Sequence, residues 1–137
     1  MSKHRKDGRP EFRVLLRAIE QRDPELSIGF YSDDARLRLL NRDMPKSAPL
    51  ELRGKAQIAS YLRTVFGQQS THSIEREVFG EDRVVFWKLS DYPNGSLGVV
   101  ETTLELHGGE IVRQLDEILL DGQANCEERG AREEAAV

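Results

Sequence analysis

Apolar positions in the first part of the chain recur every three or four residues, which is the spacing of amphipathic helices. The first helix is predicted to begin at Pro10, and its apolar stripe is made of Phe12, Leu15, Leu16 and Ile19. A short second helix follows, in which Asp23 suits the N-cap and Pro24 suits the first helical position. This second helix is expected to continue through Tyr31.

A third helix is predicted over residues 55–66, directly after Gly54. Its buried side is made of Ile58, Tyr61, Leu62, Val65 and Phe66. Between the second and third helices, residues 35–41 alternate between apolar and polar side chains, which indicates a half-buried strand. Residues 50–53, "LELR", are expected to form a short returning strand.

The second half of the chain alternates between apolar and polar residues, and this is the period of strands. Strands are predicted over residues 71–79, 83–91, 96–107 and 110–120. The segments between them are short and carry turn residues, as in "YPNG" and "GG", so these strands should form consecutive antiparallel hairpins. Gly98 is a candidate for a bulge that lets a long strand bend.

This order of elements predicts an α+β domain over residues 10–121, in which a curved antiparallel sheet wraps around the N-terminal helices as a conical barrel. A cone of this kind has a mouth where a small ligand can be buried. Residues 1–9 are expected to form a flexible basic N-terminus, and residues 122–137 a flexible polar C-terminal tail.

The composition removes several function classes. Of the 137 residues, 38% are hydrophobic and 32% are charged, which is typical of soluble globular proteins. The net charge of -4 gives no basic field for nucleic acid. No apolar run reaches the ~18 residues that span a bilayer, and no signal-peptide pattern follows the basic start, so we expect a cytoplasmic protein that does not bind membranes.

Metal and cofactor sites are also not expected. The single cysteine, Cys126, excludes an internal disulfide and a multi-cysteine zinc site. The three histidines show no spacing typical of metal ligands. Phosphate-binding and dinucleotide-binding fingerprints are absent, so the sequence predicts no metal and no cofactor.

Two segments resemble a known family. "LRGKAQIASYL" (52–62) and "GGEIVRQLDEILLD" (108–121) are similar to motifs of the SnoaL-like members of the NTF2-like superfamily, and the resemblance covers residues 11–121. It implies a cystatin-like α+β fold, a homodimer and an apolar pocket for a small polyketide-like or terpenoid-like molecule. Because this fold hosts many unrelated activities, each catalytic pattern has to be matched residue by residue.

Two enzyme patterns of the superfamily do not match this chain. The tyrosine, the base and the neutral acid of ketosteroid isomerases fall at Leu15, Leu39 and Thr102, and none of these side chains can serve that chemistry. Limonene-epoxide-hydrolase-like members have an Arg-x-Asp where this chain has Lys88 and Ser90. Lysine lacks the planar two-pronged donation of arginine, so this activity is disfavoured as well.

Asp116 is the leading candidate for acid–base chemistry. Aspartate is poorly suited to the interior of a strand, so its side chain either faces solvent beside a cation or lines the pocket. In the pocket, loss of solvation would raise its pKa toward a useful range. The resemblance to SnoaL-type cyclases, which use an aspartate with a nearby histidine, favours the pocket and makes His72 the candidate partner.

The comparison with ketosteroid isomerases, together with the expected conical fold, gives the residues that should contact a ligand. They are Leu15, Tyr31, Leu39, Tyr61, Trp87, Thr102, Gln114 and Ile118. Both faces of the strand over 83–91 contain apolar residues, so the alternation does not place Trp87. It could be a ligand platform, a core residue or a residue of a dimer surface.

Two functions therefore remain open. One is a small-molecule-binding protein, or a cofactor-free enzyme of the cyclase, isomerase or dehydratase type that acts through Asp116. The other is a non-catalytic homodimerisation module whose cone is filled by its own side chains. An open cavity beside Asp116 favours the first function, and a filled cone with an apolar outer sheet face favours the second.

Overall fold

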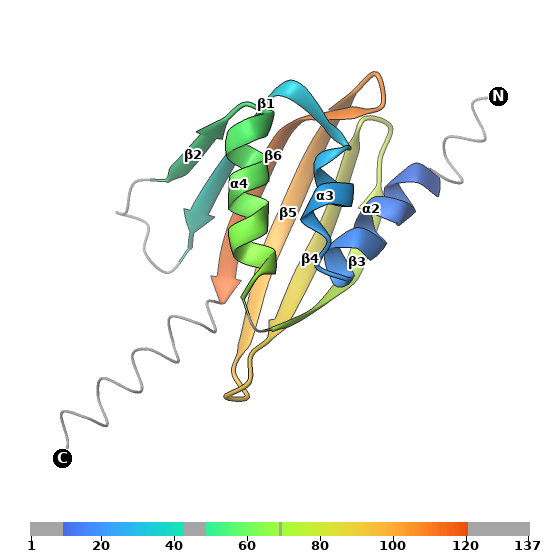
Figure 1. Cartoon of the computed structure of the whole chain (residues 1–137). Helices are drawn as coiled ribbons and strands as arrows, with labels where there is room; N and C mark the ends of the chain where they lie inside the picture. Colours follow the sequence, from blue (N-terminus) through green and yellow to red (C-terminus); the bar gives the residue numbers. More distant parts are fainter. Residues whose placement is uncertain (1–9, 43–48, 69, 121–137) are drawn as a thin grey trace, which may run out of the picture.

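Three helices lie on one face of a six-stranded curved sheet (Figure 1). This computed structural model describes residues 10–42, 49–68 and 70–120. The elements are α2 (Pro10–Glu20), α3 (Pro24–Ile28), β1 (Tyr31–Asn41), β2 (Leu50–Arg53), α4 (Lys55–Phe66), β3 (Thr71–Phe79), β4 (Arg83–Asp91), β5 (Leu97–His107) and β6 (Glu110–Leu120). The predicted α+β class with a curved sheet is confirmed.

The sheet has the strand order β2-β1-β6-β5-β4-β3. All neighbouring strands are antiparallel except β1 and β6, which are parallel. The prediction of a wholly antiparallel sheet was therefore wrong, because the meander from β3 to β6 returns beside β1 with β6 running in the same direction. The sheet is also open, with β2 and β3 at its edges, so it curves around the helices without closing into a barrel.

The start of β1 differs from the prediction. The second helix was expected to continue through Tyr31, but α3 ends at Ile28 and Tyr31 begins β1. Two backbone contacts explain the difference. The amide of Gly29 donates to the carbonyl of Leu26 and closes the helix, and the amide of Ile111 donates to the carbonyl of Phe30 at 2.8 Å and ties the chain to β6.

Register shifts accompany the curvature of the sheet. One lies in β5 between Val99 and Val100, next to the predicted bulge position Gly98. Another lies in β3 between Glu75 and Val78, where Arg76 has a φ of 60°. Bulges of this kind bend a strand and increase its local twist.

The core lies between the helices and the inner face of the sheet. Its buried residues include Phe12, Leu15, Leu16, Ile58, Leu62, Phe66, Leu37, Val84, Phe86, Leu104 and Ile111.

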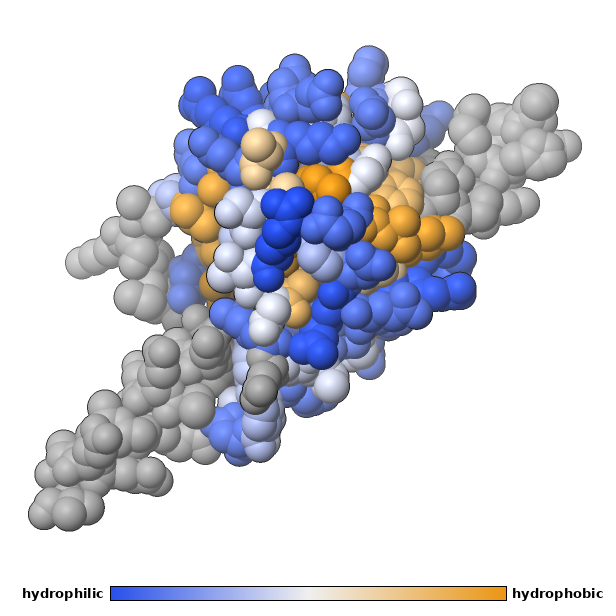
Figure 2. Space-filling view, viewed as in Figure 1, coloured by the Kyte–Doolittle hydropathy of each residue, from blue (hydrophilic) through white to orange (hydrophobic). Residues whose placement is uncertain are grey.

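Seen from the helix side, most of the surface is hydrophilic, with hydrophobic patches between the polar regions (Figure 2). The predicted flexible ends at 1–9 and 122–137, with Cys126, lie outside the described residues. Within the described parts of the chain, no helix is long and apolar enough to cross a membrane.

Candidate acid–base site

Asp116 lies on the inner face of the sheet, in the middle of β6. Strand alternation puts Gln114 and Asp116 inward and exposes Arg113 and Leu115 on the opposite face. The side chain of Asp116 is buried, with 4% of the residue exposed. Asp116 is paired with Thr102 of β5, so these two side chains point to the same side.

A chain of hydrogen bonds orients the Asp116 carboxylate. The Thr102 hydroxyl and the Gln114 amide Nε2 each donate to Asp116 Oδ1, both at 2.9 Å. The Tyr31 hydroxyl donates to Gln114 Oε1, which fixes the direction of that amide. Since both bonds to the carboxylate end on Oδ1, Oδ2 is the oxygen without a hydrogen bond from the described residues.

Burial raises the pKa of Asp116, and three neighbours act in the opposite direction. The Lys88 ammonium has the largest lowering effect, followed by the hydrogen bonds from Gln114 and Thr102. The carboxylate in turn raises the pKa of the hydroxyl groups of Tyr31 and Tyr61, although burial contributes most to both shifts. Both tyrosines are therefore neutral donors at physiological pH.

Lys88 lies on the inner face of β4, between Phe86 and Ser90 in the strand alternation. The residue as a whole is half-buried, and its Nζ lies 5.9 Å from the centroid of the Phe66 ring. Burial lowers the pKa of the Lys88 ammonium, while the Asp116 carboxylate acts to raise it. No ion pair joins Lys88 to any other described residue, so its interaction with Asp116 acts through space at more than contact distance.

His72 of β3 is buried beside the same lysine. Its Nδ1 lies 3.0 Å from the Ser90 hydroxyl, and its buried Nε2 has no hydrogen-bond partner in the described parts of the chain. Burial lowers the pKa of His72 to about 4, and the charges of Lys88 and Arg22 add to this effect. The imidazole is therefore neutral at physiological pH.

Lys88 lies in the walls of two cavities. The inner cavity has a volume of about 20 Å³, and its wall includes Asp116, Thr102, Gln114 and Tyr31. The outer cavity has a volume of about 170 Å³, and its wall includes Tyr61, His72, Ser90, Leu39 and Ile118. Lys88 lines both cavities, whereas Asp116 lines only the inner one.

The structure brings most of the predicted site residues to these cavities. Tyr31, Thr102, Gln114 and Asp116 surround the inner cavity, whereas Leu39, Tyr61, His72 and Ile118 line the outer one. Leu15 lies in the core with 1% of its surface exposed and lines neither cavity. His72, the predicted partner of Asp116, lies near Lys88 and not beside the Asp116 carboxylate. His107, the last residue of β5, is exposed.

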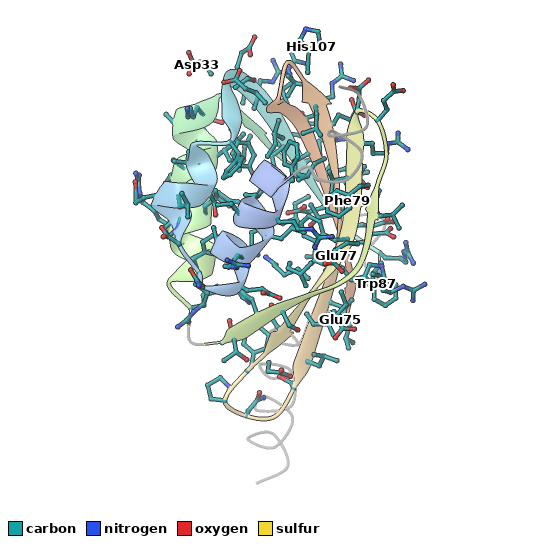
Figure 3. All side chains as sticks on the ribbon, turned by 90° about the vertical axis from the view of Figure 1, so that its right-hand side faces the viewer. Asp33, Glu75, Glu77, Phe79, Trp87 and His107 are labelled. Carbon is teal, nitrogen blue, oxygen red and sulfur yellow. The ribbon has the colours of Figure 1, made fainter. Side chains whose placement is uncertain are left out.

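Trp87 points away from the cavities, on the side of the sheet opposite to the helices (Figure 3). Its Nε1 donates to Glu101 Oε2 at 3.3 Å, and the Arg76 guanidinium lies 4.3 Å from the centroid of its ring. The proposed role as a ligand platform therefore does not fit its position. The residues of β4 that point inward are Phe86 and Lys88.

Lys88 and Ser90 were considered as the counterparts of an Arg-x-Asp pattern but were not among the residues predicted to contact a ligand. Their spacing of two residues places them on the same face of the strand over 83–91. Because both faces of that strand carry apolar residues, the alternation alone did not show which face points inward. Within the described residues, no cluster of three potential metal ligands is present.

Comparisons with known proteins identify the fold. No family model matches the chain, and no curated protein matches its sequence. An NTF2-like protein of unknown function from Mesorhizobium loti superposes with a TM-score of 0.68 at 12% identity, over 78% of this chain and 86% of that one. This chain has the NTF2-like fold.

Two further structures share the NTF2-like fold or its curved sheet. An NTF2-like protein of unknown function from Burkholderia xenovorans LB400 superposes with a TM-score of 0.65 at 14% identity, over 80% of each chain. A de novo designed protein with a curved β-sheet superposes with a TM-score of 0.63 at 19% identity, over 81% of this chain and 87% of that one. At these identities the likeness concerns the fold, so function has to be argued from the site.

Proposed function

We propose that this protein binds a small molecule in the outer cavity and exchanges a proton with it through Asp116. The observation that carries the proposal is a buried carboxyl group, oriented by two hydrogen bonds, next to a cavity that a lysine connects to it. Strongly shifted titratable groups that gather at a cavity are typical of functional sites.

The volume of the outer cavity indicates the size of the ligand. At about 170 Å³ it is similar to an engineered cavity of ~150 Å³ that takes up benzene. Ligand pockets for larger molecules usually have ~300–1,000 Å³. The best fit is therefore a molecule with one ring, which is smaller than the polyketide-like or terpenoid-like molecule that the family resemblance implies.

The side chains around the cavity suit proton transfer next to a carbonyl group. Asp116 Oδ2 has no hydrogen bond from the described residues and can accept a proton, which a ligand in the outer cavity would deliver by way of Lys88, because Lys88 lines both cavities. The Lys88 amino group and the Tyr61 hydroxyl carry hydrogen-bond donors that can stabilise the negative charge that develops on a carbonyl oxygen. This chemistry requires no cofactor, because the carboxylate and the donors supply both halves of the proton transfer.

Binding can be tested by NMR titration with benzyl alcohol and cyclohexanone. Gly98 lines the outer cavity and is paired with Ser90, so the side chain in Gly98→Val would enter the cavity and should abolish binding. Thr103→Val, on the outer face of the same strand, is the matched control and should bind like the wild type. Equal binding by wild type and Gly98→Val would overturn the assignment of the cavity.

A specific feature of the outer sheet face favours homodimerisation as a second function. One row of cross-strand partners there is basic, and it consists of Arg53, Arg36, Arg113, Glu105 and Arg83. A second row is acidic and contains Glu117, Glu101, Trp87 and Glu75. Between them lies a row with Leu115, Thr103 and Val85.

We infer that two copies pack face to face about a two-fold axis that runs along the middle row. This axis reverses the strand direction, so the basic row of one copy faces the acidic row of the other. Ion pairs within one copy, such as Arg42 with Glu117 at 3.1 Å, reduce the charge of the acidic row but do not remove it. Electrostatic complementarity of this kind fixes the orientation of an interface more than it sets its strength.

A charge-swap experiment tests this orientation by analytical ultracentrifugation. Arg36→Glu/Arg83→Glu makes both rows acidic, and Glu75→Arg/Glu101→Arg makes both rows basic. Each double variant should be monomeric alone, and an equimolar mixture should form a heterodimer. A wild type that is monomeric, or two variants that dimerise as well as the wild type, would contradict the inferred interface.

A further inference from the structure

The amine of Lys88 has an unusual position among the charged groups of the protein. The four ion pairs of the described residues are all formed by arginines whose side chains are more than half exposed. Lys88, in contrast, lies on the inner face of β4 and lines both cavities. Its Nζ faces the Phe66 ring, and no carboxylate of the described residues lies within ion-pair distance.

These surroundings favour the neutral amine more than water does. Removal of a lysine from solvent disfavours its ammonium form, and here burial lowers the pKa of Lys88. The groups around it have different effects. The Asp116 carboxylate favours the ammonium, His72 is neutral, and the Tyr61 and Tyr31 hydroxyl groups carry no charge at physiological pH. A desolvated lysine in a pocket is an activated nucleophile.

We propose that Lys88 forms an imine with a small aldehyde or ketone held in the outer cavity. The inference rests on the proposed binding role of this cavity and names the chemical class of its ligand. Three positions carry it. The Lys88 side chain lines the outer cavity, the same side chain lines the inner cavity together with Asp116, and the outer cavity volume of about 170 Å³ suits a carbonyl compound with one ring.

The chemistry balances without any further reactant. The Nζ lone pair attacks the carbonyl carbon, and a proton moves from nitrogen to the carbonyl oxygen, which gives a carbinolamine. Asp116, in its neutral carboxyl form, protonates the hydroxyl group, which leaves as water while the C=N bond forms. The resulting carboxylate then takes the remaining proton from nitrogen. One amine and one carbonyl compound thus give one imine and one water, with no oxidation or reduction.

The alternative role of Lys88 is a counter-charge for Asp116. The two roles differ in what the nitrogen must do, because a counter-charge needs only its positive charge, whereas imine formation needs a lone pair. Lys88→Arg keeps the charge and removes the nucleophile. Lys55 at the start of α4 lines neither cavity, so Lys55→Arg is the matched control.

The test uses the full chain with benzaldehyde and sodium cyanoborohydride, which reduces an imine to a stable secondary amine. Modified sites are located by peptide mass spectrometry, and benzyl alcohol binding is measured in parallel by NMR. We expect one main adduct, on Lys88, at least tenfold above that on Lys55. The adduct should be lost in Lys88→Arg and kept in Lys55→Arg.

Two results would overturn the inference. If benzyl alcohol binds but benzaldehyde labels Lys88 no faster than Lys55, imine formation is wrong while the cavity remains a binding site. If benzyl alcohol does not bind and Lys88 is not labelled preferentially, the proposed binding function fails as well. Because the mapping is done on the wild-type chain, these outcomes do not depend on the folding of any variant.

Discussion

At Asp116, burial and hydrogen bonding act on the pKa in opposite directions. Burial disfavours the carboxylate, whereas Lys88 and the donors Gln114 and Thr102 favour it. Oδ1 is held by both donors, so Oδ2 remains as the oxygen for proton exchange. The two hydrogen bonds hold the Asp116 carboxyl group in a defined orientation, and burial makes its ionisation more costly than in water.

Thr102→Val should raise the pKa of Asp116 further, because it removes a hydrogen bond that stabilises the carboxylate. The variant keeps the shape of the side chain and should lose about 1 kcal/mol of unfolding free energy. Carbon-detected NMR of the Asp116 carboxyl group measures the titration directly. Thr103→Val on the outer face is the control, and an unchanged Asp116 titration in Thr102→Val would refute the role of this bond.

His72 should make the protein less stable in acid. Its pKa is lowered to about 4 in the folded state, below the ordinary value of 6.5, so between these values the unfolded chain binds more protons than the folded one. Stability should therefore fall as the pH drops through this window, and no further loss from this group is expected below about pH 4. Asp116 acts in the opposite direction, because its pKa is raised.

The comparison of wild type with His72→Asn isolates this contribution. Denaturant unfolding from neutral pH down to about pH 4 should show a loss that is about 1–2 kcal/mol larger in the wild type, after allowance for solvent screening. Asp116 is present in both proteins, so its opposing effect largely cancels. Parallel pH profiles of the two proteins would show that His72 is not a buried neutral base.

The elements follow the local sequence signals closely where turns and alternation agree. Strands predicted over 71–79, 83–91 and 110–120 have these bounds in the structure, because alternation and short turn segments specify them together. The boundary at Tyr31 was predicted wrongly, because Phe30 and Tyr31 continue a helical apolar pattern. Tyr31 belongs to β1 and pairs with Ile111 of β6, which lies far along the chain.

The short helix α3 depends on its N-cap. The Asp23 carboxylate accepts a hydrogen bond from the amide of Leu26 at 3.1 Å, as the sequence predicted. Asp23→Ala should therefore lower the unfolding free energy by about 1 kcal/mol in urea denaturation. Asp33, which is exposed in β1 (Figure 3), provides the control, and an equal loss in Asp33→Ala would argue against a capping role.

The site could be predicted only in part, for a reason that also lies at the level of elements. The last strand carries Gln114, Asp116 and Ile118 on one face, and the family resemblance selected that face. For β4, the residues Val84 and Phe86 are as apolar as Val85 and Trp87, so periodicity could not decide which set points inward. The register with β5 decides it, because Phe86 is paired with Thr102 on the inner face, and Lys88 lies on that same face.

At the scale of the whole molecule, the two faces of the sheet have separate roles in this account. The inner face, covered by helices, contributes the carboxyl group, the amine and the cavities. The outer face presents a basic and an acidic row on either side of a less charged row. Dimerisation and ligand binding are therefore expected to respond to different substitutions, and Arg36→Glu should leave ligand binding unchanged.

The most direct test of proton exchange through Asp116 follows the α-hydrogens of cyclohexanone in D₂O by NMR. We expect that the wild-type protein accelerates their exchange for deuterium. Asp116→Asn and Gly98→Val should each lose at least nine-tenths of this acceleration, whereas Thr103→Val should keep it. Exchange at the same rate with wild type and Asp116→Asn would contradict the assignment of Asp116 as the proton-transferring group.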